Sequence, residues 1–155
     1  MDNSKQMAKL ATNLQRQIHI LIKGHDVCDQ VCLVQHGVTA AQGYALLALP
    51  REGSATMNEI SDSLGIASST MTRTIDPLVA KELVYRALDE GDRRIVRVGL
   101  TSQGLKIRNS IENSLETFFM MVLEGIKEED RSKAISSMEQ VTAAFKKALE
   151  VCCPG

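Results

Sequence analysis

The sequence predicts a mainly helical fold that carries one small β-hairpin. Apolar residues recur every three or four positions along most of the 155 residues, which is the period of an amphipathic helix. Residues 83–87 and 94–100 are instead rich in Val, Ile and Tyr and flank a polar link that contains glycine, a pattern typical of a hairpin. The hydrophobic fraction of 44% is sufficient for a buried core.

Two helices are predicted before residue 50. The first runs from residue 5 to about 34, because apolar side chains are spaced by three or four at Met7, Leu10, Leu14, Ile18, Leu21 and Ile22. The second begins at Thr39, which forms a capping-box pattern with Gln42, and it ends at Pro50, since proline cannot continue the hydrogen-bond ladder.

A helix-turn-helix is predicted over residues 56–83. Two short helical patterns flank Leu64-Gly65-Ile66, and the glycine permits the tight turn between them. Pro77 lies inside the second helix, where it removes the hydrogen bond to the Arg73 carbonyl and is expected to bend the rest of that helix. The hairpin follows, with its turn expected at Glu90-Gly91, so that this part of the chain forms a winged helix-turn-helix.

Two further helices are predicted towards the carboxyl end, one opened by Thr101 and one that runs from the acidic residues 128–130 to about Lys147. The terminal helices carry longer apolar stripes than the small central module can cover. We therefore expect residues 1–38 and 105–155 to form a helical dimerisation region, and residues 39–104 to form the winged helix-turn-helix domain.

Charge and motifs narrow the function. The net charge of −1 means that nucleic-acid binding must come from local placement of arginine and lysine. No stretch reaches the roughly 18 consecutive apolar residues of a membrane span, and the first 20 residues lack the apolar centre of a secretory signal, so a cytoplasmic protein is expected. The chain has no glycine-rich phosphate loop, no nucleophile elbow and no His-Glu pair at metalloprotease spacing. We therefore expect that the protein is not an enzyme and requires no cofactor.

The candidate base- and phosphate-contacting residues lie at the start of the second helix of the motif, because this end of the helix enters the major groove of double-stranded DNA. They are Ser68, Ser69, Thr70, Thr72 and Arg73. Hydroxyl groups and backbone amides at a helix start bind phosphates, and Arg73 has two possible roles, a bidentate contact with guanine or neutralisation of a phosphate.

The polar link of the hairpin adds Arg93 and Arg94, one of which is expected to enter the minor groove, while Asp92 orients a neighbouring guanidinium. Taken singly, such serines and threonines are commonly helix caps, and such arginines are commonly solvated. The same fold also occurs in protein-interaction modules, but a module that does not bind DNA has no need of both Arg73 and Arg94.

The winged segment resembles the MarR (multiple antibiotic resistance regulator) family of transcriptional regulators. The resemblance lies in residues 39–42, 68–73, 83–86, 92–94 and 100–104. It implies an obligate homodimer formed by the terminal helices, a pseudo-palindromic operator, and repression that is relieved by a small ligand or by cysteine oxidation. Two positions depart from the family pattern: Glu82 stands where a glycine usually ends the recognition helix, and Pro77 lies within that helix.

Four cysteines provide candidate effector residues. His25, Cys28 and Cys32 share one face of the first helix, and the neighbouring Cys152 and Cys153 are able to add ligands if the last helix of either protomer reaches this region. Such thiol-rich sites suit a metal or metalloid effector such as arsenic(III), mercury, copper(I) or zinc.

Three other interpretations of the cysteines and the effector remain open. The thiols are also suited to a redox switch in which one is oxidised and a neighbour resolves it to a disulfide. Alternatively they are small buried apolar residues without a sensing role. A phenolic ligand between the dimerisation helices and the winged module would leave no motif, and it is compatible with inert cysteines.

Overall fold

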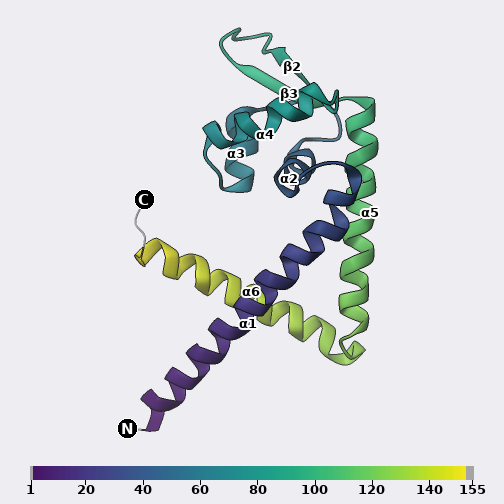
Figure 1. Ribbon diagram of the computed structural model, residues 1–155. Helices are drawn as coiled ribbons and strands as arrows, with labels where there is room; N and C mark the ends of the chain where they lie inside the picture. Colours follow the sequence, from purple (N-terminus) through teal and green to yellow (C-terminus); the bar gives the residue numbers. More distant parts are fainter. Residues whose placement is uncertain (1, 153–155) are drawn as a thin grey trace. The chain divides into compact units, whose positions relative to one another are not determined.

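The computed structural model describes residues 2–152 as seven helical segments and a three-stranded sheet (Figure 1). The helices are α1 (Asp2–Cys32), η1 (Val34–His36), α2 (Ala40–Ala48), α3 (Met57–Leu64), α4 (Ser68–Ala80), α5 (Ser102–Glu124) and α6 (Glu128–Cys152). The strands are β1 (Ala55–Thr56), β2 (Val84–Leu88) and β3 (Val96–Leu100). The prediction of a mainly helical fold with a small hairpin is confirmed.

The chain divides into two compact units, residues 1–116 and residues 117–155, and each is described by itself. The first unit holds α1 to α4, the sheet and most of α5; the second holds the end of α5 and α6. Within residues 2–152, no helix has both the length and the apolar character required to cross a membrane.

Thr39 caps α2 as its sequence predicts. The Thr39 hydroxyl accepts a hydrogen bond from the Gln42 amide at 3.2 Å, and the Gln42 side chain accepts one from the Thr39 amide at 3.1 Å. A second capping box, between Thr56 and Glu59, starts α3 and was not predicted, although the Thr-x-x-Glu pattern is present in the sequence. Both boxes satisfy backbone amides that would otherwise lack a partner at the helix start.

The helix-turn-helix is formed by α3 and α4, with Gly65 between them. Gly65 has φ +65°, a left-handed conformation that costs glycine little, and its amide bonds back to α3. The buried face of α4 packs against α2 and α3 through Met71, Ile75 and Leu78, all of which are fully buried. Burial of this face fixes the position of α4 in the first unit, and leaves its other face open to solvent.

The recognition helix α4 continues past Pro77 and ends in a Schellman motif. The Leu83 amide bonds to the Leu78 carbonyl and the Glu82 amide to the Val79 carbonyl, both at 2.9 Å. This motif requires one residue in the left-handed backbone conformation, and that residue is Glu82, with φ +56°. Among the described residues, Glu82 is the only one other than glycine with a positive φ. The position at which related proteins are expected to have glycine is therefore strained here.

The sheet has β3 at its centre, paired antiparallel with both β1 and β2. The β2–β3 register joins Val84 to Leu100 and Leu88 to Val96, which forms the predicted hairpin. The expected turn at Glu90-Gly91 is wrong: the chain only bends there, and the hydrogen-bonded turn runs from Asp92 to Ile95, whose amide bonds to the Asp92 carbonyl at 2.9 Å. β1 has two residues and was too short to predict.

The two last helices begin where the sequence predicts. The Thr101 hydroxyl accepts a hydrogen bond from the Gly104 amide at the start of α5, and α6 begins at Glu128. The end predicted for α6 near Lys147 is wrong, since the helix continues to Cys152. No glycine or proline occurs from residue 126 to residue 153, so nothing in the sequence ends the helix at the basic pair.

Replacement of Glu82 by Gly is expected to stabilise the protein by about 1 kcal/mol, because the left-handed conformation carries no steric cost in glycine. For a chain of this size that corresponds to an increase in Tm of roughly 2–4 °C, measurable by calorimetry. Ala80→Gly is the matched control, since it places a glycine two residues earlier in regular helix and should lower Tm. An unchanged or lower Tm for Glu82→Gly would contradict the assignment of strain.

Candidate nucleic-acid interface

One face of α4 is exposed and carries the predicted contact residues. Met71, Thr74, Ile75 and Leu78 are buried on the opposite face. The exposed residues are Ser68, Ser69, Thr70, Thr72 and Arg73. The structure therefore brings these five residues together on one solvent-facing surface of the amino-terminal half of the helix.

The Ser68 side chain also joins α4 to α3. Its hydroxyl donates to the Asn58 side-chain oxygen at 3.0 Å and lies 3.2 Å from the Ser61 hydroxyl. The sequence analysis did not single out Asn58, because an asparagine in the first helix of the motif has no distinctive spacing. The Ser68 hydroxyl thus has a structural role at the first turn of α4, in addition to the role predicted for it.

Arg93 and Arg94 lie at the tip of the wing and both are exposed. Neither guanidinium has a hydrogen bond or ion pair with any residue in the part of the chain that the structure describes. The Asp92 carboxylate accepts the backbone amide of Arg94 at 2.9 Å and does not hold a guanidinium, so the role predicted for it is wrong. Asp92 therefore shapes the turn and leaves both arginine side chains available for a ligand.

The carboxylate that does hold a guanidinium in the wing is Asp89, which directly follows β2. It accepts the amides of Gly91 at 2.9 Å and Asp92 at 3.2 Å, and its other oxygen lies 3.1 Å from the Arg97 guanidinium. The two backbone amides, and to a smaller extent Arg97, lower the pKa of Asp89 below its usual value. Asp89 thus remains charged and fixes the base of the arginine turn.

Arg97, which pairs with Asp89, also binds the segment before β1. Its guanidinium donates to the Ser54 hydroxyl at 3.1 Å and to the Ser54 carbonyl at 3.2 Å. A second ion pair, of 2.5 Å between Arg86 on β2 and Asp76 on α4, joins the wing to the recognition helix. Within the first unit, Arg97 thus connects the arginine turn to the segment before β1, and Arg86 connects the wing to α4.

Cys28 and Cys32 lie together at the end of α1. Their side chains are 1% and 2% exposed, the Cys28 thiol lies 3.7 Å from the Cys32 sulfur, and the Cys32 thiol lies 3.6 Å from the Ser114 carbonyl. Burial, and then the neighbouring Cys32, raise the pKa of Cys28 to about 11. The Cys28 side chain is therefore a neutral thiol at neutral pH.

His25 does not join the two cysteines, although it shares their helix face. Its ring stacks on Tyr44, with Nε2 3.1 Å from the Tyr44 hydroxyl, and that hydroxyl donates to Asp29 at 2.7 Å. Burial and the bond to Asp29 hold the pKa of Tyr44 well above its usual range. The predicted set of three therefore separates into a thiol pair and a His-Tyr-Asp group that joins α1 to α2.

Cys152 is exposed near the end of α6 in the second unit, and Cys153 lies outside the described residues. Residues 2–152 contain no group of three or more His, Cys, Asp or Glu side chains placed to hold one metal ion.

Comparison with known proteins identifies the family. A sequence profile of the MarR family matches residues 36–95. The HTH-type transcriptional regulator YsmB of Bacillus subtilis is 32% identical over 108 residues, which cover 70% of each chain. The chain belongs to the MarR family. Its members are DNA-binding transcriptional regulators, so the winged module described above is a DNA-binding module.

Solved structures agree with this assignment. The reduced form of MarR from Escherichia coli is 25% identical and superposes with a TM-score of 0.71, over 83% of this chain and 95% of that one. A MarR family transcription regulator named SP03579 has a TM-score of 0.82 over 95% of this chain and 97% of its own. At 18% identity, the second comparison supports the fold alone.

Replacement of Asp89 by Asn is expected to loosen the arginine turn, because the amides of Gly91 and Asp92 lose a charged acceptor and Arg97 loses its partner. Amide hydrogen exchange over residues 90–95, followed by NMR, should become several-fold faster. Glu90→Gln is the matched control, since it removes the same charge from the neighbouring exposed position. Equal exchange rates in the two variants would refute the role of Asp89.

Proposed function

We propose that this MarR-family protein is a homodimeric repressor that binds a pseudo-palindromic duplex and is released from it by a small effector. In each protomer α4 enters a major groove, with base contacts from Thr70, Thr72 and Arg73 and phosphate contacts from the helix start at Ser68 and Ser69. The observation that carries this proposal is the exposed polar face of α4, opposite a fully buried apolar face.

The wing supplies the second contact. Arg93 and Arg94 are exposed on a turn that Asp89 and Asp92 hold through backbone amides, so both guanidinium groups are available to a phosphate or to the minor groove. The net charge of the chain is −1, so attraction to DNA depends on such local clusters. A protein of the same fold, a mutant of MepR from Staphylococcus aureus, was solved bound to an oligodeoxyribonucleotide.

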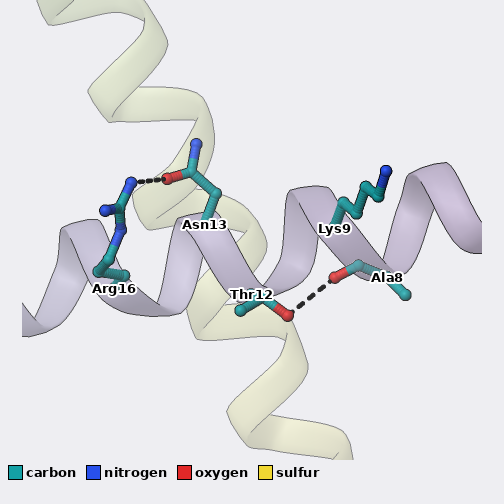
Figure 2. A pocket seen from close by; sticks show the side chains of 5 residues that line it. All are labelled: Ala8, Lys9, Thr12, Asn13 and Arg16. Atoms are coloured by element: carbon teal, nitrogen blue, oxygen red, sulfur yellow. Dashed lines mark hydrogen bonds between the residues drawn. The ribbon is translucent and has the colours of Figure 1, made fainter.

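The second protomer is inferred from an apolar stripe along α1. Met7, Leu10, Leu14 and Leu21 are each about half exposed or more, at helical spacing on a single helix face. Another face of α1 is more polar and carries a shallow depression lined by Ala8, Lys9, Thr12, Asn13 and Arg16 (Figure 2). An exposed stripe of this length marks a protein interface, and we assign it to a second copy of the chain.

Unpartnered apolar side chains occur in the second unit as well. Ile135, Met138, Phe145 and Leu149 follow helical spacing on α6 and are about half exposed. Both of the terminal segments that were expected to form the dimerisation region, residues 1–38 and 105–155, therefore contribute such a face. Repression is proposed because the relative MdtR of Bacillus subtilis, 34% identical over 70 residues and 45% of each chain, is a transcriptional repressor.

Arg94→Ala is expected to weaken binding to all duplexes alike, and Arg73→Ala to weaken binding and also change base preference. The reason is that a phosphate contact carries no sequence information, whereas a bidentate arginine–guanine pair does. Fluorescence anisotropy with a duplex selected from a random pool, and with its single-base variants, measures both effects. The loss of one phosphate contact should also reduce the slope of log affinity against log salt by about 1.

Arg16→Ala is the matched control for both variants, because Arg16 is exposed on the polar face of α1 and carries the same charge. Its affinity, base preference and salt slope should equal those of the unmodified protein. Full binding by the Arg73→Ala/Arg94→Ala double variant would exclude the proposed interface.

Leu10→Glu/Leu14→Glu is expected to convert the dimer to a monomer. Each buried leucine contributes about 2 kcal/mol, and a twofold interface contains every side chain twice. Sedimentation velocity measures the change. Asn13→Glu, on the polar face of the same helix, is the control and should remain dimeric; a dimeric leucine variant would show that α1 lies outside the interface.

A further inference from the structure

The thiol pair of α1, Cys28 and Cys32, places two sulfur donors next to each other. The two residues are four positions apart on one helix face, their sulfurs are 3.7 Å apart, and neither side chain is more than 2% exposed. We infer that this pair binds trivalent arsenic as a dithiol site, and that arsenic bound there lowers the affinity for DNA. The second part rests on the proposed function; the first does not.

The distance between the sulfurs is compatible with one bridging atom that bonds both. Metal–thiolate bonds are about 2.3 Å long, and two such bonds to sulfurs 3.7 Å apart enclose an angle of about 107°. This is the angle of a pyramidal or tetrahedral centre, and trivalent arsenic is pyramidal. A linear ion such as copper(I) or mercury(II) would need sulfurs about 4.6 Å apart, twice that bond length.

The helix disfavours the alternative of a redox disulfide. Residues four apart on a helix have Cβ atoms about 5–6 Å apart, whereas a disulfide requires about 3.5–4.5 Å. A Cys28–Cys32 disulfide therefore needs the last turn of α1 to distort. A bridging atom between the sulfurs lengthens the link and leaves the backbone of α1 in place.

The reaction with arsenous acid needs no oxidant. The two S–H bonds and two of the three As–OH bonds break, two As–S bonds form, and two molecules of water leave. Arsenic stays trivalent and retains one hydroxyl group. The Cys32 thiol loses its proton in this step, so it no longer donates to the Ser114 carbonyl of α5, 3.6 Å away.

The pair is connected to the DNA-binding helix through Leu33. Leu33 follows Cys32 directly, is fully buried, and packs so closely on Gly43 of α2 that a Cβ there would lie 2.6 Å from its Cδ2. α2 in turn packs against α4. An additional atom between two buried sulfurs therefore displaces side chains along a tightly packed route from α1 to the recognition helix.

The binding test uses the full-length reduced protein and arsenite. The decisive protein is Cys152→Ser/Cys153→Ser, in which Cys28 and Cys32 are the two remaining cysteines. For this variant, native mass spectrometry, thiol titration and arsenic X-ray absorption should give one arsenic per chain, two thiols consumed and two sulfur neighbours. Cys28→Ala and Cys32→Ala should each lose the bound arsenic.

The regulatory test adds DNA. Arsenite should weaken binding of the selected duplex about tenfold or more in the unmodified protein and in Cys152→Ser/Cys153→Ser, and should have no effect in Cys28→Ala/Cys32→Ala. The number of bound arsenic atoms is measured without DNA, so it tests the arsenic site independently of DNA binding. If the protein bound no duplex, that result would contradict the proposed function but not the arsenic site.

Several outcomes would overturn the inference. Arsenic absent from Cys152→Ser/Cys153→Ser, or three sulfur neighbours per arsenic, would exclude a site made by the pair alone. Tighter binding of zinc than of arsenite by that variant would reject the choice of arsenic. Release of DNA by peroxide together with a Cys28–Cys32 disulfide would refute the argument from helix geometry. Unchanged DNA affinity with arsenic bound would overturn the regulatory part.

Discussion

Met71, Ile75 and Leu78 bury one face of α4 against α2 and α3, and the surface that meets DNA depends on this packing. Burial of each such side chain contributes about 1.5–3 kcal/mol, more than any single surface hydrogen bond in the module. Because the buried positions Met71, Thr74, Ile75 and Leu78 recur every three or four residues, Arg73 lies outside the buried face and is exposed. The ion pair from Arg86 to Asp76 joins the wing to the same helix.

Local patterns in the sequence were sufficient to predict four parts of the fold. Apolar spacing predicted α1 and the helix-turn-helix, the Thr39–Gln42 capping pattern predicted the start of α2, and the runs rich in Val, Ile and Tyr predicted the hairpin. Prediction failed where a tertiary contact decides the structure. β1 forms because Ala55 and Thr56 pair with β3, and the wing turn lies at Asp92–Ile95 because Asp89 accepts the amides that precede it. No local pattern contains those partners. α6 extends to Cys152 because nothing in its sequence ends it.

The candidate sites were predictable to different degrees. Exposure of Arg73 follows from its place in the helical period, whereas the role of Asp92 does not. The wing link offers three carboxylates, those of Asp89, Glu90 and Asp92, and only the fold pairs Asp89 with Arg97. The same holds at the end of α1. His25 shares a helix face with Cys28, but its ring contacts Tyr44 of α2, so Cys28 and Cys32 form a pair without it. Such competition between partners appears only in three dimensions.

The apolar spacing of α1 runs from Met7 to Cys32, but its two ends have different partners. The half up to Leu21 is exposed, which supports its assignment to the proposed dimer interface, while Cys28 and Cys32 are buried, with the Cys32 thiol against α5. One continuous helix therefore links the proposed interface to the base of the DNA-binding module. In the proposed dimer, side chains displaced at the thiols would alter the spacing of the two recognition helices, and one such spacing matches the proposed pseudo-palindromic duplex.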